Sequence, residues 1–177
     1  MDENERLKQF EQTVLPHLDA AYNLARWLAG NDHDAQDVAQ EASLRAFRFL
    51  AGFRGDNARA WLLSIVRNTF YTWLRKNRPP ETTLDINDEH LELEESASNT
   101  ETVNPHFADA DAVRRAIAAL PVEFREMVIL REMEGYSYLE IAEVAEVPIG
   151  TVMSRLARAR KLLKKHLAAE FNPGEQP

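Results

Sequence analysis

The chain has 177 residues, enough for one domain or two small ones, and a formal net charge of −8. It contains no cysteine, which excludes disulfide bonds, thiolate metal sites and thiol redox sensing. The first residues, MDENERLKQF, are too charged for a signal peptide, and no apolar run approaches membrane-spanning length, so a cytoplasmic location is expected. Strand signals are poor and helical periodicity runs nearly throughout, which predicts an all-α protein.

The first module, expected over residues 1–78, contains three predicted long helices. The first carries an apolar stripe that ends at Gly30, and Asn31 with Asp32 offers an N-cap for the second, DAQDVAQEASLRAFRFL. The third is predicted over 58–76, after a break that contains two glycines. The first stripe consists of Phe10, Val14, Leu18, Ala21, Ala25 and Leu28. The residues predicted to be buried on the third helix are Leu62, Ile65, Val66, Thr69 and Trp73.

Three carboxylates share one face of the second predicted helix, because Asp34, Asp37 and Glu41 are spaced by three and four residues. A metal site is a poor interpretation, since only His33 adds a nearby donor and one helix does not close a coordination sphere. The acids can favour the helix N-terminus through its dipole. Equally, the acids can bind a basic surface of a partner protein, and the neighbouring Gln40 would suit such a polar interface. Both interpretations remain open.

Aromatic and basic residues are interleaved in the third helix and the loop before it. Some of the rings belong to the core, and Trp73 is assigned to packing because it falls on the apolar stripe. Exposed rings beside cations and an amide are also what unstacked single-stranded bases require, with Arg contacting phosphates and the amide reading a base edge. The set is Phe53, Arg54, Trp61, Arg67, Asn68, Phe70, Tyr71, Trp73 and Arg75.

A flexible acidic linker is expected over residues 79–106. It opens with two prolines, has few large apolar residues, and carries eight acids with no Lys or Arg, which accounts for the whole net charge. By contrast, residues 45–78 hold eight cations against Asp56 alone. The overall negative charge therefore hides two basic surfaces, and it does not argue against nucleic-acid binding.

The second module is expected over 107–172, followed by a tail at 173–177. Helices are predicted near 111–120, stopped by Pro121, and near 123–133. A helix-turn-helix follows over 138–165, with a capping box of Ser137 and Glu140 and a turn at 147–150. Its second helix has one apolar face, and residues 149–166 hold six cations and no acid, which favours DNA binding over a merely solvated face. The apolar face consists of Val152, Leu156, Ala159 and Leu163, and the opposite face of Thr151, Ser154, Arg158, Lys161 and Lys165.

Three blocks of the sequence resemble the extracytoplasmic-function (ECF) group of bacterial RNA polymerase sigma factors, in the sigma-70 family. DAQDVAQEASLRAF is similar to the segment that binds core polymerase, and FRGDNARAWLLSIVRNTFYTWLRKNR to the segment that melts and reads the minus-10 element. ALPVEFREMVILREMEGYSYLEIAEVAEVPIGTVMSRLARARKLL is similar to the minus-35-reading domain. The resemblance implies a region 2 helical bundle at 1–78 and a region 4 helix-turn-helix at 107–172.

The same resemblance implies roles for individual residues. Contacts with the clamp helices of the polymerase's largest subunit would be made by Asp34, Asp37, Gln40, Glu41, Leu44 and Phe47. Minus-10 DNA, including a flipped base of the non-template strand, would be bound by Phe53, Arg54, Trp61, Ile65, Arg67, Asn68 and Arg75. The minus-35 duplex would be contacted by Thr151, Met153, Ser154, Arg155, Arg158 and Lys161.

Two residues depart from the family pattern. Met153 stands where many members carry an arginine that reads a minus-35 base, and Thr72 where an acid is common in the minus-10 segment. A bidentate arginine–base pair is worth about 1–3 kcal/mol of discrimination, so the minus-35 preference is expected to differ or to shift to Arg155 and Arg158.

The function expected from the resemblance is that of an alternative sigma factor without catalysis, cofactor or metal. Its partners would be core RNA polymerase, through the clamp helices and the flap, and promoter DNA. An anti-sigma factor is also expected, and membrane contact only indirectly, through a membrane-bound anti-sigma factor. The acidic linker would pass near the RNA exit path.

Three alternative functions can be compared with the sequence. A sigma mimic that titrates an anti-sigma factor without binding DNA would have no need of the basic faces around Arg67 and Arg158. A helix-turn-helix repressor would need a dimerisation helix, and nothing resembles one. A metal-dependent nucleic-acid enzyme built on the three carboxylates is the weakest alternative. No phosphate-cradling glycine loop, metalloprotease motif, nucleophile elbow or triad is present in the sequence.

Overall fold

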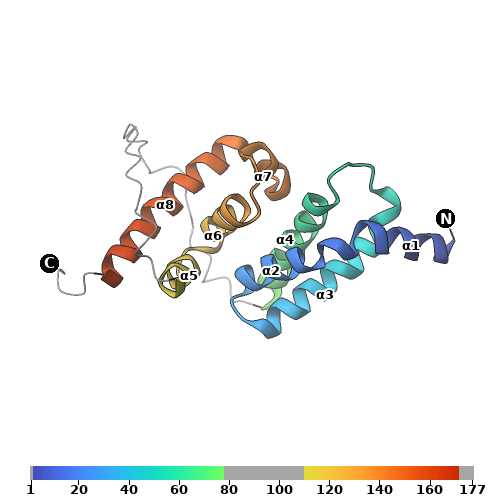
Figure 1. The fold of residues 1–177 in the computed structure, drawn as a ribbon, viewed down its shortest axis with the longest axis horizontal. Helices are drawn as coiled ribbons and strands as arrows, with labels where there is room; N and C mark the ends of the chain where they lie inside the picture. The colour runs from blue at the N-terminus through green and yellow to red at the C-terminus, as the bar shows by residue number, and fades with distance from the viewer. Residues whose placement is uncertain (1, 78–109, 172–177) are drawn as a thin grey trace.

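The structure is a computed structural model that describes residues 2–77 and 110–171, and within these ranges every regular element is a helix. The linker predicted over 79–106 and the tail predicted over 173–177 lie outside the described residues. The N-terminal unit (Figure 1) consists of α1 (Glu3–Thr13), the 3₁₀ turn η1 (Leu15–His17), α2 (Leu18–Ala29), α3 (Asp32–Phe49), the 3₁₀ turn η2 (Leu50–Gly52) and α4 (Ala58–Asn77). The C-terminal unit consists of α5 (Ala110–Ala118), α6 (Val122–Val128), the π-helical segment η5 (Ile129–Met133), α7 (Tyr138–Ala145) and α8 (Ile149–Phe171).

The first predicted helix is in fact two helices. Pro16 lies in the 3₁₀ turn η1 between α1 and α2, where a ring without an amide hydrogen cannot continue an α-helical ladder. Phe10 remains on α1 and packs edge-on against Phe47 of α3, with ring centroids 5.5 Å apart. The prediction of one continuous stripe is therefore wrong, although both halves contribute to the same core.

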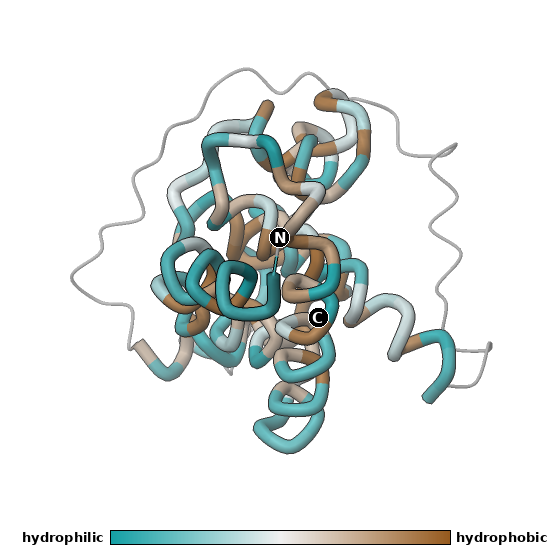
Figure 2. The backbone as a smooth tube through the Cα atoms, turned by 90° about the vertical axis from the view of Figure 1, so that its right-hand side faces the viewer, coloured by the Kyte–Doolittle hydropathy of each residue, from teal (hydrophilic) through white to brown (hydrophobic). Residues whose placement is uncertain are grey.

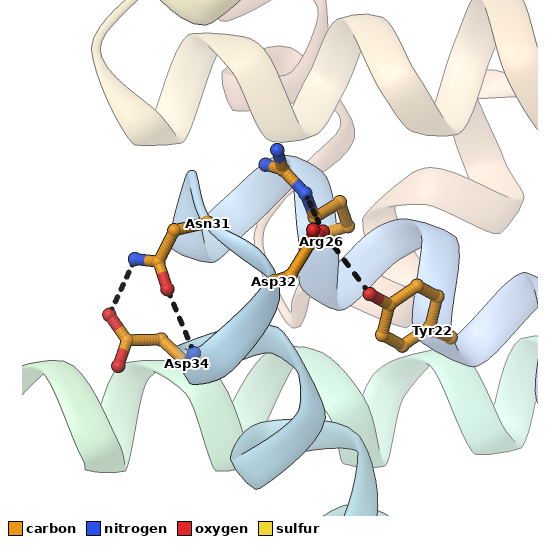
Figure 3. Close-up of polar contacts among 5 residues, drawn as sticks. All are labelled: Tyr22, Arg26, Asn31, Asp32 and Asp34. Carbon is orange, nitrogen blue, oxygen red and sulfur yellow. Dashed lines mark hydrogen bonds and ion pairs between the residues drawn. The ribbon is translucent and has the colours of Figure 1, made fainter.

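A short turn joins α2 to α3, and Figure 3 shows the contacts that fix it. Gly30 ends α2 with φ 83°, a left-handed conformation that suits glycine. Asn31 is the N-cap of α3, as predicted, and its side chain accepts a hydrogen bond of 2.9 Å from the backbone N–H of Asp34. Asp32 belongs to the first turn of α3 and accepts from Arg26 Nε at 2.6 Å, which ties α3 back to α2.

The helix-turn-helix forms as predicted, except at its turn. Ser137 and Glu140 make the predicted capping box at the start of α7. The turn comes earlier than 147–150, because Glu146 adopts the left-handed conformation, with φ 55°, and α8 already begins at Ile149. Pro148 suits the position just before that helix, where its carbonyl accepts from Thr151 N–H at 3.0 Å.

The buried side chains of both units form one connected apolar cluster. Helix α4 packs on α7 and α2 packs on α6, so the two units lie side by side (Figure 1). Hydrophobic and hydrophilic residues alternate along the helices (Figure 2), as expected when each helix buries one face. On α8 the predicted stripe is buried at Val152, Leu156 and Ala159 and half-buried at Leu163.

The predicted burial of α4 needs one correction. Leu62, Val66 and Thr69 are buried, but Ile65 and Trp73 are only half-buried. Trp73 stacks on Phe70, with centroids 6.0 Å apart, from the rim of the core. Helical periodicity identifies the inward face of α4, but the width of that face depends on which helices cover it.

Candidate nucleic-acid and polymerase interface

One face of α3 remains uncovered in the structure. Asp37, Gln40 and Leu44 recur at three and four residues along it, and all three are exposed, Leu44 by 50%. Glu41 beside them is held by Arg45, whose Nε lies 2.9 Å from its carboxylate. Exposed acids and an amide beside an uncovered leucine form a mixed polar and apolar surface, which is typical of protein interfaces.

The other members of the predicted polymerase-binding set have structural contacts of their own. Asp34 accepts a 2.6 Å hydrogen bond from the amide of Asn31, so its carboxylate is part of the helix cap (Figure 3). Phe47 packs on Phe10 and lies under the guanidinium of Arg6, 5.7 Å from the ring centre. These contacts favour the helix-terminus interpretation for Asp34.

His33, Asp34 and Asp37 lie close enough together to be considered as metal ligands, since their donor atoms are within 4.8 Å of one another. However, the His33 ring is 3.8 Å from the Asp37 carboxylate and Asp34 is bonded to Asn31. The group is a solvent-facing helical turn with internal partners, and we assign no ion to it.

The loop between α3 and α4 forms an aromatic pocket of about 470 Å³. Phe53 and Trp61 face each other inside it, with ring centroids 4.7 Å apart and planes inclined by 34°. Arg54 is anchored beside them by a 2.6 Å hydrogen bond to the carbonyl of Ala51. The aromatic pocket is therefore a preformed space with two rings and a cation, which suits an unstacked base.

Asn57 helps to fix this loop and is not among the predicted site residues. Its side-chain oxygen accepts a 2.9 Å hydrogen bond from the backbone N–H of Ala60, in the first turn of α4. The signal was present in the sequence, since Asn is a preferred residue just before a helix. The cap fixes the start of α4, and hence the placement of Trp61 one residue later.

The wall of the aromatic pocket opposite the loop comes from the C-terminal unit. Glu140, Glu143 and Val144 of α7 line it. The pocket is thus lined by the two rings, Arg54 and Asp56 on the side of the N-terminal unit and by two glutamates on the side of α7.

Two of the predicted minus-10 residues, Arg67 and Asn68, face the C-terminal unit. Arg67 donates from Nε to the carboxylate of Glu126 on α6. Asn68 donates from Nδ2 to Glu146, at the end of α7, over 3.1 Å. Arg75 is exposed, with a guanidinium nitrogen 3.4 Å from the hydroxyl of Thr72. The described arrangement therefore brings Phe53, Arg54 and Trp61 together and directs Arg67 and Asn68 elsewhere.

Glu126 is a buried acid that contacts predicted DNA-binding residues, and no sequence pattern predicted this role. Its side chain is fully buried, and its second carboxylate oxygen accepts a 2.9 Å hydrogen bond from the hydroxyl of Tyr71. Burial raises the pKa of Glu126, while the Arg67 guanidinium and the Tyr71 hydroxyl oppose the shift. Burial also raises the pKa of Tyr71, so its phenol stays protonated as a donor. The one sequence feature that could have indicated burial of Glu126 is its position among the apolar residues Phe124, Met127 and Val128, which are buried.

Two more side chains join the units. Arg59 at the start of α4 pairs with Glu134, which follows η5 and is largely buried. Arg125 of α6 donates to the carbonyls of Trp27 at 2.7 Å and Leu28 at 3.5 Å, where α2 ends. A cation at that position also suits the negative end of the α2 dipole.

The outer side of α8 carries the predicted minus-35 residues. Met153 is 53% exposed, Thr151 and Ser154 are half-buried, and the Ser154 hydroxyl donates to the Thr151 carbonyl at 3.1 Å. Lys161 is exposed, whereas Arg155 and Arg158 are half-buried. Arg155 lies near enough to Glu126 to lower the pKa of that carboxyl. The helix presents hydroxyls, a methionine and cations along one surface.

Comparison with known proteins identifies the class to which this fold and surface belong. The sigma-70 region 2 family matches residues 13–79, and the sigma-70 region 4 family matches residues 110–163. The ECF RNA polymerase sigma-E factor of Escherichia coli K12 is 41% identical over 138 residues, which cover 73% of this chain and 72% of that protein. The RNA polymerase sigma-H factor of Pseudomonas aeruginosa is 36% identical, over 90% of this chain and 86% of that protein. The chain belongs to the ECF group of RNA polymerase sigma factors, as the sequence analysis predicted.

Other relatives add detail. The ECF sigma factor SigE of Mycolicibacterium smegmatis is 34% identical over 92% of this chain, but the match spans only 63% of that longer protein. Among solved structures, this chain is similar to the sigma factor RpoE in complex with the anti-sigma factor NepR from Bartonella quintana, with a TM-score of 0.68. The two chains are 30% identical, and the match covers 90% of this chain and 97% of that one. CnrH, in complex with the cytosolic domain of CnrY, gives a TM-score of 0.61 at 26% identity over 90% of this chain and 88% of that one.

No helix among the described residues combines the length and the apolar character that crossing a membrane requires.

Proposed function

We propose that this chain is an alternative sigma factor that gives core RNA polymerase its promoter specificity and helps to open the minus-10 element. The observation that carries the proposal is the combination, in one chain, of an aromatic pocket before α4 and a basic helix-turn-helix at α7–α8. The role is one of binding, so no side chain is assigned a chemical step. Its place of action would be where the polymerase works, in the cytoplasm.

Core polymerase would bind the uncovered face of α3. The supporting observation is that Asp37, Gln40 and Leu44 are exposed together on one side of α3. The interface would combine the leucine as an apolar centre with polar contacts around it, as is usual for protein interfaces. Glu41 and Phe47 would border it, with Asp34 fixing the start of the helix.

Minus-10 recognition would use the aromatic pocket. A base flipped out of the duplex would stack against the Phe53–Trp61 ring pair, with Arg54 beside its phosphate. Base–aromatic stacking is worth about 1–3 kcal/mol per base, and that energy would offset part of the cost of unpairing. Ile65, Arg67, Asn68 and Arg75 on α4 would extend the same surface along the strand.

Minus-35 recognition would use the first turns of α8, laid in the major groove. Thr151, Ser154 and Arg155 would lie nearest the bases, while Arg158 and Lys161 would contact phosphates. Met153 offers an apolar contact, which among the bases suits a thymine methyl group.

The division into a region 2 domain at 1–78 and a region 4 domain at 107–172 remains part of the proposal. So does an anti-sigma factor as a partner, which is supported by the two similar structures that contain one. Such a partner would hold the factor inactive until a signal releases it.

The test is run-off transcription with sigma-free bacterial core polymerase on a library of promoter fragments. We expect specific transcripts, and we expect the double variant Asp37→Ala/Gln40→Ala to abolish them by removing polar contacts to the polymerase. Glu11→Ala/Gln12→Ala is the matched control, because it removes an exposed carboxylate and an exposed amide from α1, outside the α3 face.

The outcomes separate the candidate functions. Transcripts that survive the double variant would disprove the assignment of the α3 face. A wild-type protein that binds core polymerase yet yields no transcript from any template would disprove the promoter-specificity role. A protein that binds neither core polymerase nor DNA, but binds an anti-sigma factor, would instead be the sigma mimic.

A further inference from the structure

The C-terminal unit presents carboxyl groups to the part of α4 that would bind the minus-10 strand. Glu126 contacts Arg67, and Glu146 contacts Asn68. These contacts join residues far apart in the chain, with sequence separations of 59 and 78. A guanidinium and an amide that would otherwise meet phosphates and base edges are therefore already occupied by protein oxygens.

The contact of Glu126 with Arg67 is the most deeply buried of these. The carboxylate is 0% exposed and the Arg67 side chain only 15% exposed. Both carboxylate oxygens have donors, one from Arg67 and one from Tyr71. The Arg67 guanidinium also lies over the Tyr71 ring, 4.6 Å from its centre. A nucleic-acid strand cannot reach Arg67 while this contact is made.

The aromatic pocket is restricted in the same arrangement. Glu140 and Glu143 of α7 line it opposite Phe53 and Trp61. Their negative charge repels the phosphate that would accompany a captured base.

We propose that the described arrangement is an autoinhibited closed state, in which carboxyl groups of the C-terminal unit occupy the minus-10-binding residues of the N-terminal unit. This inference rests on the proposed function, since it concerns access to the same surface. Glu126 is the central contact, Glu146 adds a contact at the neighbouring Asn68, and Glu134 adds one at Arg59, nearer the start of α4. The minus-10 strand binds only after α6 and α7 leave α4.

The hydrogen bonds of Glu126 run only between the units. Its described hydrogen-bond partners, Arg67 and Tyr71, both belong to α4. When the units part, water can hydrate all three groups, and neither unit loses a hydrogen bond of its own. Replacing Glu126 by alanine would leave Arg67 Nε and the Tyr71 hydroxyl without their Glu126 acceptor in the closed state alone, which favours the open state.

The first experiment measures the distance between the units. The chain contains no cysteine, so two introduced ones are the only sites that thiol dyes can label. Asp19→Cys on α2 and Ala168→Cys on α8 are exposed positions, one in each unit, and Asp19 lies outside the α3 face. Energy transfer between the dyes, without polymerase or DNA, is expected to be high in the wild type and lower in Glu126→Ala.

The second experiment measures access to the minus-10 surface. The probe is a fluorescein-labelled single-stranded DNA that carries the minus-10 sequence found by run-off transcription. Loss of an acceptor for a charged donor shifts the closed–open equilibrium roughly tenfold or more, so free Glu126→Ala should bind the probe roughly tenfold more tightly than the wild type. Glu132→Ala is the matched control: that exposed acid pairs with Arg160 within the C-terminal unit, and its removal should change neither readout.

Unchanged energy transfer in a folded Glu126→Ala variant would overturn the closed state, whatever the transcription assay shows. Lower energy transfer without tighter probe binding, in a factor that still transcribes with core polymerase, would show that the contact does not inhibit. If Glu126→Ala does not fold, Glu146→Gly decides. It removes the second carboxylate at an exposed position whose φ of 55° suits glycine, so it should open the protein without weakening α7.

Discussion

The buried carboxyl of Glu126 should make closure depend on pH. Burial raises its pKa in the closed state, whereas the hydrated side chain of the open state has an ordinary carboxyl pKa. The closed state therefore binds a proton more readily, and lowering the pH from neutral should increase the closed fraction. The surrounding groups are Arg67 and Tyr71 on α4 and Arg155 on α8.

The measurement is energy transfer between the two dyes across a pH series. Glu126→Gln cannot titrate and keeps one acceptor oxygen, so it should show a weaker pH dependence and remain closed like the protonated carboxyl. An identical pH response in the wild type and in Glu126→Gln would contradict the assignment of the titration to this residue.

Met153 should influence which minus-35 base is preferred. Its side chain is 53% exposed on the outer face of α8, and an arginine at this position can bond a guanine edge bidentately. Met153→Arg is expected to shift preference toward guanine at one minus-35 position, by about 1–3 kcal/mol. Selection of bound sequences from a randomised minus-35 library checks this, and an unchanged selected motif would contradict it.

The capping box of α7 should contribute measurably to stability at the scale of the helix. The Ser137 hydroxyl accepts from the Glu140 backbone N–H at 3.2 Å, and the Glu140 carboxylate accepts from the Ser137 backbone N–H at 2.7 Å. Ser137→Ala removes one of these contacts and is expected to cost about 1 kcal/mol. Chemical denaturation provides the measurement. Ser43→Ala is the control, because that hydroxyl only bonds the carbonyl four residues earlier within α3. Equal stability of the two variants would contradict the role of the cap.

The helix-turn-helix illustrates how local signals and tertiary packing share control of an element. Its capping box was predictable because the two side chains bond backbone groups three residues away. The sequence predicts the turn too late in the chain, because Pro148 and Gly150 are typical turn residues. In the structure, both residues lie at the start of α8. The left-handed residue is Glu146, whose side chain contacts Asn68 of the other unit.

The molecule as a whole should open when it initiates transcription. Arg67 and Asn68 cannot serve the C-terminal unit and a DNA strand at once. We therefore expect energy transfer between the dyes to fall when core polymerase and promoter DNA are added to the wild type. The Asp37→Ala/Gln40→Ala variant, which should not bind polymerase, is expected to keep high transfer. High transfer in an active wild-type complex would contradict the requirement for opening.

The amino-acid sequence was enough to predict the helical class, the main helices, the caps at Asn31 and Ser137, the two basic surfaces and the family. These follow from periodicity, capping chemistry and motif order, which act over a few residues or are written directly in the chain. Phe53 and Trp61 were predictable as base-binding candidates for the same reason, and the structure brings their rings together.

The contacts of Arg67 and Asn68 with acids of the other unit arise only when the chain is folded. Nothing local marks Glu126 as the partner of Arg67, because the contact spans 59 residues and arises from the packing of α4 against the C-terminal unit. The sequence showed which groups can bind nucleic acid, whereas the packing of the two units determines when those groups are free to bind it.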